Sequence, residues 1–140
     1  MAAMDWKKIC CPVDFSEPTQ TALRVAVDLC RRLGSELVFL HVDAAVKLAE
    51  ELPHGSVEAQ LTALKDDAQR RGAQRVALAR APGEPVLAIA EFAKKNAIEL
   101  IVMGTHGRVD RELTLTGSVA EAVVRKAECP VLTVHPGWKA

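Results

Sequence analysis

The sequence predicts one doubly wound, Rossmann-like α/β domain, in which helices cover both faces of a five-stranded parallel sheet. Two observations predict this class. Short apolar runs alternate with segments whose apolar residues recur every three or four positions, in the order β-α-β-α-β-α-β-α-β. The runs are nearly continuous, which is typical of parallel strands buried on both faces. The length of 140 residues suits a single domain, which we expect to span residues 1–140.

The first strand is expected at residues 8–13, and Asp14 ends it. Ser16 is expected to cap the following helix, with Pro18 in its first turn, where a missing N–H does no harm. Gly34 is the expected stop of this helix. Its predicted apolar face consists of Ala22, Leu23, Ala26, Val27, Cys30 and Leu33.

The second and third strands are expected at residues 36–42 and 76–80, because both segments are apolar runs. Between them a helix is predicted from Ser56 to about Arg71, and Gly72 ends it. Residues 43–55 are ambiguous, and a short helix broken by Pro53 is one alternative. The apolar face of the clear helix consists of Val57, Leu61, Leu64 and Ala68.

The second half of the chain continues the alternation. Pro85 opens a helix that runs to about Asn96, and the fourth strand follows at residues 99–103. Residues 104–116 are expected to form a long loop. A helix at 118–127 and a last strand at 130–135 complete the pattern, and we expect that last strand to lie at an edge of the sheet.

Composition excludes several classes of protein. Lys and Arg total 18 against 18 Asp and Glu, and only 4% of residues are aromatic, so a broadly basic nucleic-acid-binding surface is not expected. No apolar run approaches the ~20 residues that a membrane helix needs. With no secretory signal visible, the cytoplasm is the expected compartment. The four cysteines form no C-x-x-C pair, so we expect buried thiols rather than a zinc or redox site.

One loop carries the strongest chemical signal. Gly104-Thr105-His106-Gly107 is followed by nine residues and then by Gly117-Ser118, which open a helix. Glycines let backbone N–H groups approach a phosphate closely, and a helix N-terminus adds unpaired donors. The alternative is that these glycines only make turns and Ser118 only caps the helix. Neither G-x-x-x-x-G-K-[ST] nor G-x-G-x-x-G occurs, so the two standard phosphate loops are not supported.

The same loop resembles the nucleotide-binding pattern of the ATP-binding branch of the universal stress protein family. Segments along the rest of the chain extend the resemblance. Residues 8–18 look like the family's opening strand and turn, residues 100–108 like its central signature, and residues 117–119 and 129–132 like its closing segments. These blocks lie in family order and span nearly the whole chain. They therefore favour a phosphate-binding loop, which we call the cradle, over glycines that only make turns.

The resemblance implies a sheet of order 3-2-1-4-5, a homodimer, and ATP or another adenine nucleotide at the point where strand order reverses. By position, Pro12, Val13 and Asp14 border adenine and ribose, and Val42 flanks adenine. The rest of the implied site, drawn from the central and closing blocks, consists of Met103, Gly104, Gly107, Arg108, Gly117, Ser118 and Val119.

Asp14 also has a chemical reason to be part of such a site. A carboxylate after a strand can accept hydrogen bonds from ribose hydroxyls, or hold Mg²⁺ or Mn²⁺ that is bound to the phosphates. The alternative is an aspartate that only builds the turn. Two departures from the family pattern weaken the expected affinity: Ala120 stands where many relatives carry Ser or Thr, and the spacer contains Asp110 and Glu112.

We therefore expect a small stress-response module that binds ATP with little or no turnover, and no catalytic residue is assigned. Phosphoryl transfer needs a positioned base and a cation on the γ-phosphate, and the sequence offers no clear set. Two alternatives stay open: a dimeric interaction protein of the same fold without nucleotide, and a slow ATPase or adenylyl transferase. The expected dimer contact is the C-terminal edge strand. The four histidines, His41, His54, His106 and His135, have no zinc-ligand spacing.

Overall fold

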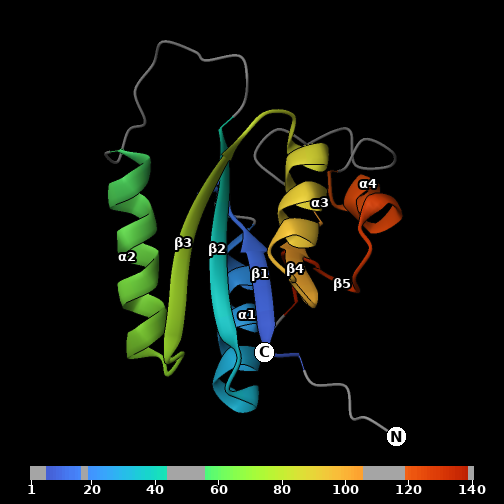
Figure 1. Ribbon diagram of the computed structural model, residues 1–140. Coiled ribbons are helices and arrows are strands. Elements are labelled where there is room, and N and C mark those ends of the chain that lie inside the picture. Colours follow the sequence, from blue (N-terminus) through green and yellow to red (C-terminus); the bar gives the residue numbers. More distant parts are fainter. Residues whose placement is uncertain (1–5, 17–18, 44–55, 106–118, 139–140) are drawn as a thin grey trace, which may run out of the picture.

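The computed structural model describes residues 6–16, 19–43, 56–105 and 119–138. Its centre is a parallel sheet in the order β3-β2-β1-β4-β5 (Figure 1), which confirms both the predicted class and the strand order that the resemblance implies. None of the described helices is long and apolar enough to cross a membrane. The strands are β1 (Lys8–Pro12), β2 (Glu36–Asp43), β3 (Arg75–Pro82), β4 (Leu100–Gly104) and β5 (Val131–Val134).

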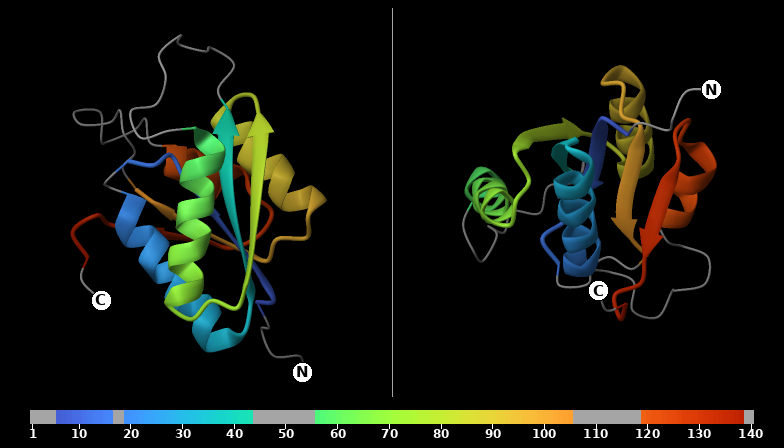
Figure 2. Two further views of the ribbon diagram at one scale, coloured as in Figure 1. Left: turned by 90° about the vertical axis from the view of Figure 1, so that its left-hand side faces the viewer. Right: turned by 90° about the horizontal axis from the view of Figure 1, so that it is seen from below.

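Helices cover both faces of the sheet, as Figure 2 shows. Because successive side chains of a strand point to opposite faces, each strand contributes to two separate cores. Ile9, Cys11 and Phe39 pack with α1 and α2 on one face. Cys10, Leu40 and Ile101 pack with α3 and α4 on the other face. The helices are α1 (Gln20–Leu33), α2 (Val57–Arg70), α3 (Pro85–Lys95) and α4 (Val119–Lys126).

The start of α1 differs from the prediction. The expected cap, Ser16, is wrong: the helix begins at Gln20 after Thr19, which makes no side-chain cap hydrogen bond. The Ser16 hydroxyl is used differently, because it donates to the carboxylate of Asp14. The backbone carbonyl of Ser16 accepts from the Thr19 N–H, so it turns the chain into the helix. Pro18 lies outside the described residues.

Gly34 ends α1, as predicted, but Leu33 does not lie on the buried face of the helix. Gly34 has φ +70°, and its N–H donates to the carbonyl of Cys30 at 2.9 Å. Leu33 was expected on the buried face, but it is 53% exposed. It is the last helical residue, and the chain leaves the helix at the next residue, Gly34, on its way to β2.

Candidate functional site

Parallel strands bring their carboxyl ends to the same edge of the sheet, and five predicted site residues meet there. Pro12 ends β1, and the N–H of Val13 donates to the carbonyl of Leu40 in β2 at 2.9 Å. Met103 and Gly104 end β4, which pairs with β1 on its other side. Val42 lies near the end of β2. The structure therefore brings Pro12, Val13, Val42, Met103 and Gly104 to one edge, as the sequence predicts.

This edge has two faces, and the predicted residues divide between them. Met103 is buried in the core beneath α3 and α4, and Val42 packs against the same core. Val13 belongs to the core beneath α1 and α2. Val119 is the first residue of α4 and is 41% exposed. The other predicted cradle residues, Gly107, Arg108, Gly117 and Ser118, lie outside the described residues, as do Asp110 and Glu112.

Ala120, one of the departures from the family pattern, is explained by its burial. Its side chain is 3% exposed and packs in the core beneath α3 and α4. A hydroxyl at this position would lie inside that core, where a polar group needs a partner. The alanine therefore removes a buried hydroxyl, and its methyl group contributes to packing.

Asp14 makes a tight turn directly after β1. One carboxylate oxygen, Oδ1, accepts from the Ser16 N–H at 2.9 Å and from the Ser16 hydroxyl at 2.5 Å. Phe15 lies between these residues with φ +63°, in the left-handed region. Two donors on one oxygen fix the orientation of the carboxylate. Asp14 therefore builds this turn, and its role toward ribose or metal remains a prediction. Within the described ranges, no group of three or more His, Cys, Asp or Glu residues is arranged to hold a metal ion.

His41, which sequence reasoning left among scattered histidines, contacts both neighbours of Asp14. It is 8% exposed, and its Nδ1 lies 3.2 Å from the carbonyl oxygen of Val13. Its ring stacks on Phe15 with centroids 5.0 Å apart and an interplanar angle of 23°. Its Nε2 lies 3.5 Å from Oδ1 of Asp43. The available signal was the alternation along residues 36–43, which places His41 and Asp43 on the same face of the strand.

Arg80 of β3 connects Asp43, which contacts His41, to Glu58 in the first turn of α2. Its guanidinium binds both carboxylate oxygens of Asp43, at 2.8 and 3.1 Å, and a third nitrogen lies 2.6 Å from a carboxylate oxygen of Glu58. These bonds raise the pKa of Arg80 above its already high ordinary value, and the bond that Arg80 donates to Asp43 is the largest cause. Bidentate geometry of this kind is directional as well as attractive. The ends of β2 and β3 and the first turn of α2 are thereby joined.

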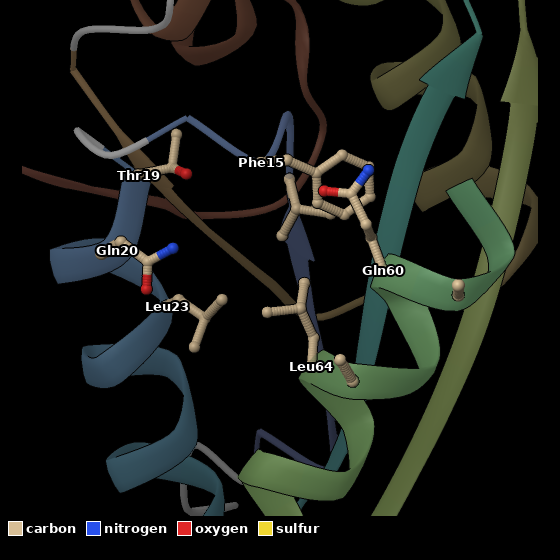
Figure 3. A pocket seen from close by; sticks show the side chains of 9 residues that line it. Phe15, Thr19, Gln20, Leu23, Gln60 and Leu64 are labelled. Carbon is tan, nitrogen blue, oxygen red and sulfur yellow. The ribbon is translucent and has the colours of Figure 1, made fainter. Parts of the chain in front are cut away.

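A pocket of about 270 Å³ opens beside the chain turn at Asp14 and Phe15, between the N-terminal ends of α1 and α2. Figure 3 shows Thr19, Gln20 and Leu23 of the α1 side facing Gln60 and Leu64 of α2. Among the described residues that line it, Val13 is the only predicted site residue, and these residues lie on the face away from Val42 and Met103. The described residues that line the pocket are Val13, Phe15, Thr19, Gln20, Leu23, Ala59, Gln60, Ala63 and Leu64.

Comparison with known proteins gives a consistent result. The sequence profile of the Universal stress protein family matches residues 5–135. A universal stress protein of Methanocaldococcus jannaschii is 32% identical over an alignment 140 positions long, which covers 92% of this chain and 82% of that protein.

Two solved structures share the fold. A universal stress protein in complex with cAMP has a TM-score of 0.77 at 24% identity, over 95% of this chain and 99% of that one. The universal stress protein of Archaeoglobus fulgidus in complex with dAMP has a TM-score of 0.67 at 24% identity, over 92% of this chain and 98% of that one. The match extends from before β1 to the residue after β5, and the chain belongs to the universal stress protein family.

Proposed function

We propose that this protein is a single-domain regulatory module that binds an adenine nucleotide at the carboxyl ends of β1, β2 and β4. The observation that carries the proposal is the position of the predicted residues. β1 lies between β2 and β4, so the order of the strands reverses at β1. In open α/β sheets, ligands bind beyond the strands at such a point. Pro12, Asp14, Val42 and Met103 all lie beside it.

Each part of a nucleotide has a matching group in the chain. Val42, which is partly exposed near the end of β2, supplies apolar surface for adenine, and the carboxylate of Asp14 suits ribose hydroxyls. Gly104, Gly107, Gly117 and Ser118, with the start of α4, supply backbone N–H groups for phosphates. The chain has no net charge, so the attraction for phosphate is local and comes mainly from these N–H groups.

ATP with Mg²⁺ or Mn²⁺ is the ligand that we expect first. A metal bound to the phosphates needs only one or two carboxylates from the protein, and Asp14 fits that requirement. The same fold holds cAMP in one solved protein and dAMP in another. We assign no catalytic residue and expect little or no hydrolysis. The four cysteines are free, which suits a reducing compartment such as the cytoplasm, where we expect the protein to act.

The cradle assignment is tested at Gly117. We expect Gly117→Val to abolish ATP binding in calorimetry, because a branched side chain would stand where a backbone N–H must approach a phosphate. Gly137→Val is the matched control, since a Cβ at Gly137 meets no atom within 4 Å and its φ is ordinary. Unchanged ATP affinity in Gly117→Val would show that the cradle assignment is wrong.

A second candidate is a dimeric interaction protein of the same fold without nucleotide. It is favoured by β5, an edge strand on which Leu132 is 39% exposed. Mass spectrometry of ligand released from the purified protein, together with calorimetry in the presence of Mg²⁺, separates the two candidates. If no adenine nucleotide is released from the protein and none binds in calorimetry, the interaction protein would be favoured.

A slow ATPase ranks third. Phosphate release is compared between the unaltered protein and Asp14→Asn, and equal rates would identify a contaminating activity. A rate that falls with the substitution would instead support hydrolysis at this site.

A further inference from the structure

We infer that His41 is a positioning residue of the proposed nucleotide site, which fixes the backbone on both sides of Asp14. The inference rests on the proposed function for the identity of the site, but its geometry stands apart from any ligand. His41 is in β2, whereas Asp14 follows β1, so the contact joins the ends of two neighbouring strands.

The first contact is with the residue before Asp14. Nδ1 of His41 lies 3.2 Å from the carbonyl oxygen of Val13, and the ring is buried. This carbonyl belongs to the peptide unit whose N–H is that of Asp14. A hydrogen bond from Nδ1–H therefore fixes the plane of that peptide. The N–H of Val13 is already bound to Leu40, so both ends of Val13 are held by β2.

The second contact is with the residue after Asp14. Phe15 has φ +63°, which a bulky side chain rarely adopts and which persists only where its surroundings enforce it. Its ring is stacked on the His41 ring at 5.0 Å. The stacking holds Phe15 in this conformation, and the conformation directs the Ser16 N–H back to the carboxylate of Asp14. His41 thus restrains the chain directly before and directly after the carboxylate.

The imidazole is itself held from its far side. Nε2 lies 3.5 Å from Asp43, which is bound bidentately by Arg80, and Arg80 also reaches Glu58. Val13 and Asp43 both offer acceptors to the ring. A neutral imidazole with its proton on Nδ1 makes the Val13 bond, and an imidazolium makes both. On this far side of the ring, the charged groups among the described residues are Asp43, Arg80 and Glu58.

Three substitutions at His41 separate its contacts. His41→Asn places an amide N–H near the position of Nδ1, so it keeps the bond to Val13 but loses the stacking on Phe15. His41→Gln places its amide near the position of Nε2 and keeps only the link to Asp43. His41→Phe keeps the ring and its stacking but has no donor. His135→Phe is the matched control, because His135 is exposed beyond β5, outside the site.

The first measurement is ATP affinity in the presence of Mg²⁺, by calorimetry. His41→Gln loses both the bond to Val13 and the stacking on Phe15, and it is expected to weaken binding by about tenfold, the usual consequence of losing a hydrogen bond that holds a group in place. His41→Phe and His41→Asn each keep one of the two contacts and are expected to lose less affinity than His41→Gln, whereas His135→Phe is expected to stay within about twofold of the unaltered protein. Unchanged affinity in His41→Gln, or an equal loss in His135→Phe, would overturn the inference.

The second measurement uses the protein without nucleotide, so that a failure of the proposed function is recognised separately. Hydrogen exchange of the Ser16 amide reports whether Asp14 keeps its turn. We expect faster exchange in His41→Gln and His41→Asn, which lose the stacking on Phe15, and protection closer to that of the unaltered protein in His41→Phe, which keeps it. If ATP does not bind the unaltered protein, the proposed function fails and exchange alone decides the role of His41. Unchanged exchange in His41→Gln would then refute it.

Discussion

Adjacent cysteines in β1 show how strongly one position along a strand changes the environment of a side chain. Cys10 packs beneath α3 and α4, whereas Cys11 packs beneath α1 and α2, next to Cys30. Burial first, and the neighbouring Cys30 second, raises the pKa of the Cys11 thiol to about 12. The folded protein therefore keeps this thiol neutral and unreactive at ordinary pH.

The raised pKa of Cys11 predicts a loss of stability in alkali. Below about pH 9, the ordinary value of the thiol, both the folded and the unfolded chain keep the proton. Between about 9 and 12, only the unfolded chain releases it, so the free energy of unfolding falls as pH rises. The contribution is about 1.4 kcal/mol for each pH unit in that window. We expect urea unfolding at pH 8 and 10.5 to show a smaller alkaline loss in Cys11→Ala. An identical alkaline loss in both proteins would contradict the assigned pKa.

At the scale of elements, the end of α1 offers a clean test of backbone conformation. Gly34 has φ +70°, and a Cβ there would meet no atom within 4 Å, so Gly34→Ala tests the conformation alone. A left-handed alanine costs roughly 1–2 kcal/mol, and we expect urea unfolding to show a loss of that size. Gly137 has equally open surroundings and an ordinary φ. Gly137→Ala should therefore change stability little, and equal losses in the two variants would contradict the argument.

The elements also show what the sequence could predict. Every strand was predicted, because each one is a nearly continuous apolar run, and Ser56 was correctly placed at the start of α2, where its hydroxyl accepts from the Ala59 N–H. Ser16 has the same residue type but is bound by Asp14, so local cap preference failed there. Leu33 satisfied the helical period, but it is 53% exposed. Periodicity therefore predicts where a helix lies, but residue type alone does not decide whether a given serine caps it.

The candidate site divides in the same way. Pro12, Val42 and Met103 could be predicted because the carboxyl end of a parallel strand has a known place in the fold. The contact of His41 with Val13 and Phe15 could not, because it joins residues 26 and 28 positions apart across two strands. The bond from Arg80 to Glu58 requires the register of β3 against β2 and the place of α2 above it. Such contacts depend on the assembled sheet.

At the scale of the whole molecule, the two edges of the sheet are unlike each other. β3 carries Arg75 and Arg80 and ends in Pro82. Charged side chains and proline at an edge oppose pairing with another sheet. β5 is uncharged, and Leu132 is 39% exposed on it. Of the two edges, β5 is therefore the one suited to pair with a second copy across a two-fold axis, which is the contact that we propose for a homodimer.

The dimer contact predicts the effect of a charge on β5. We expect Leu132→Arg to shift the protein from dimer to monomer in sedimentation equilibrium, because pairing would bring two like charges together and bury them. Since Leu132 is already partly exposed, the monomer should keep its fold and its circular dichroism spectrum. Leu87→Arg is the matched control, because Leu87 is 46% exposed on α3, away from the edge. A dimer that persists in Leu132→Arg, or dissociates equally in Leu87→Arg, would place the contact elsewhere. A monomeric unaltered protein at tens of micromolar would refute the homodimer.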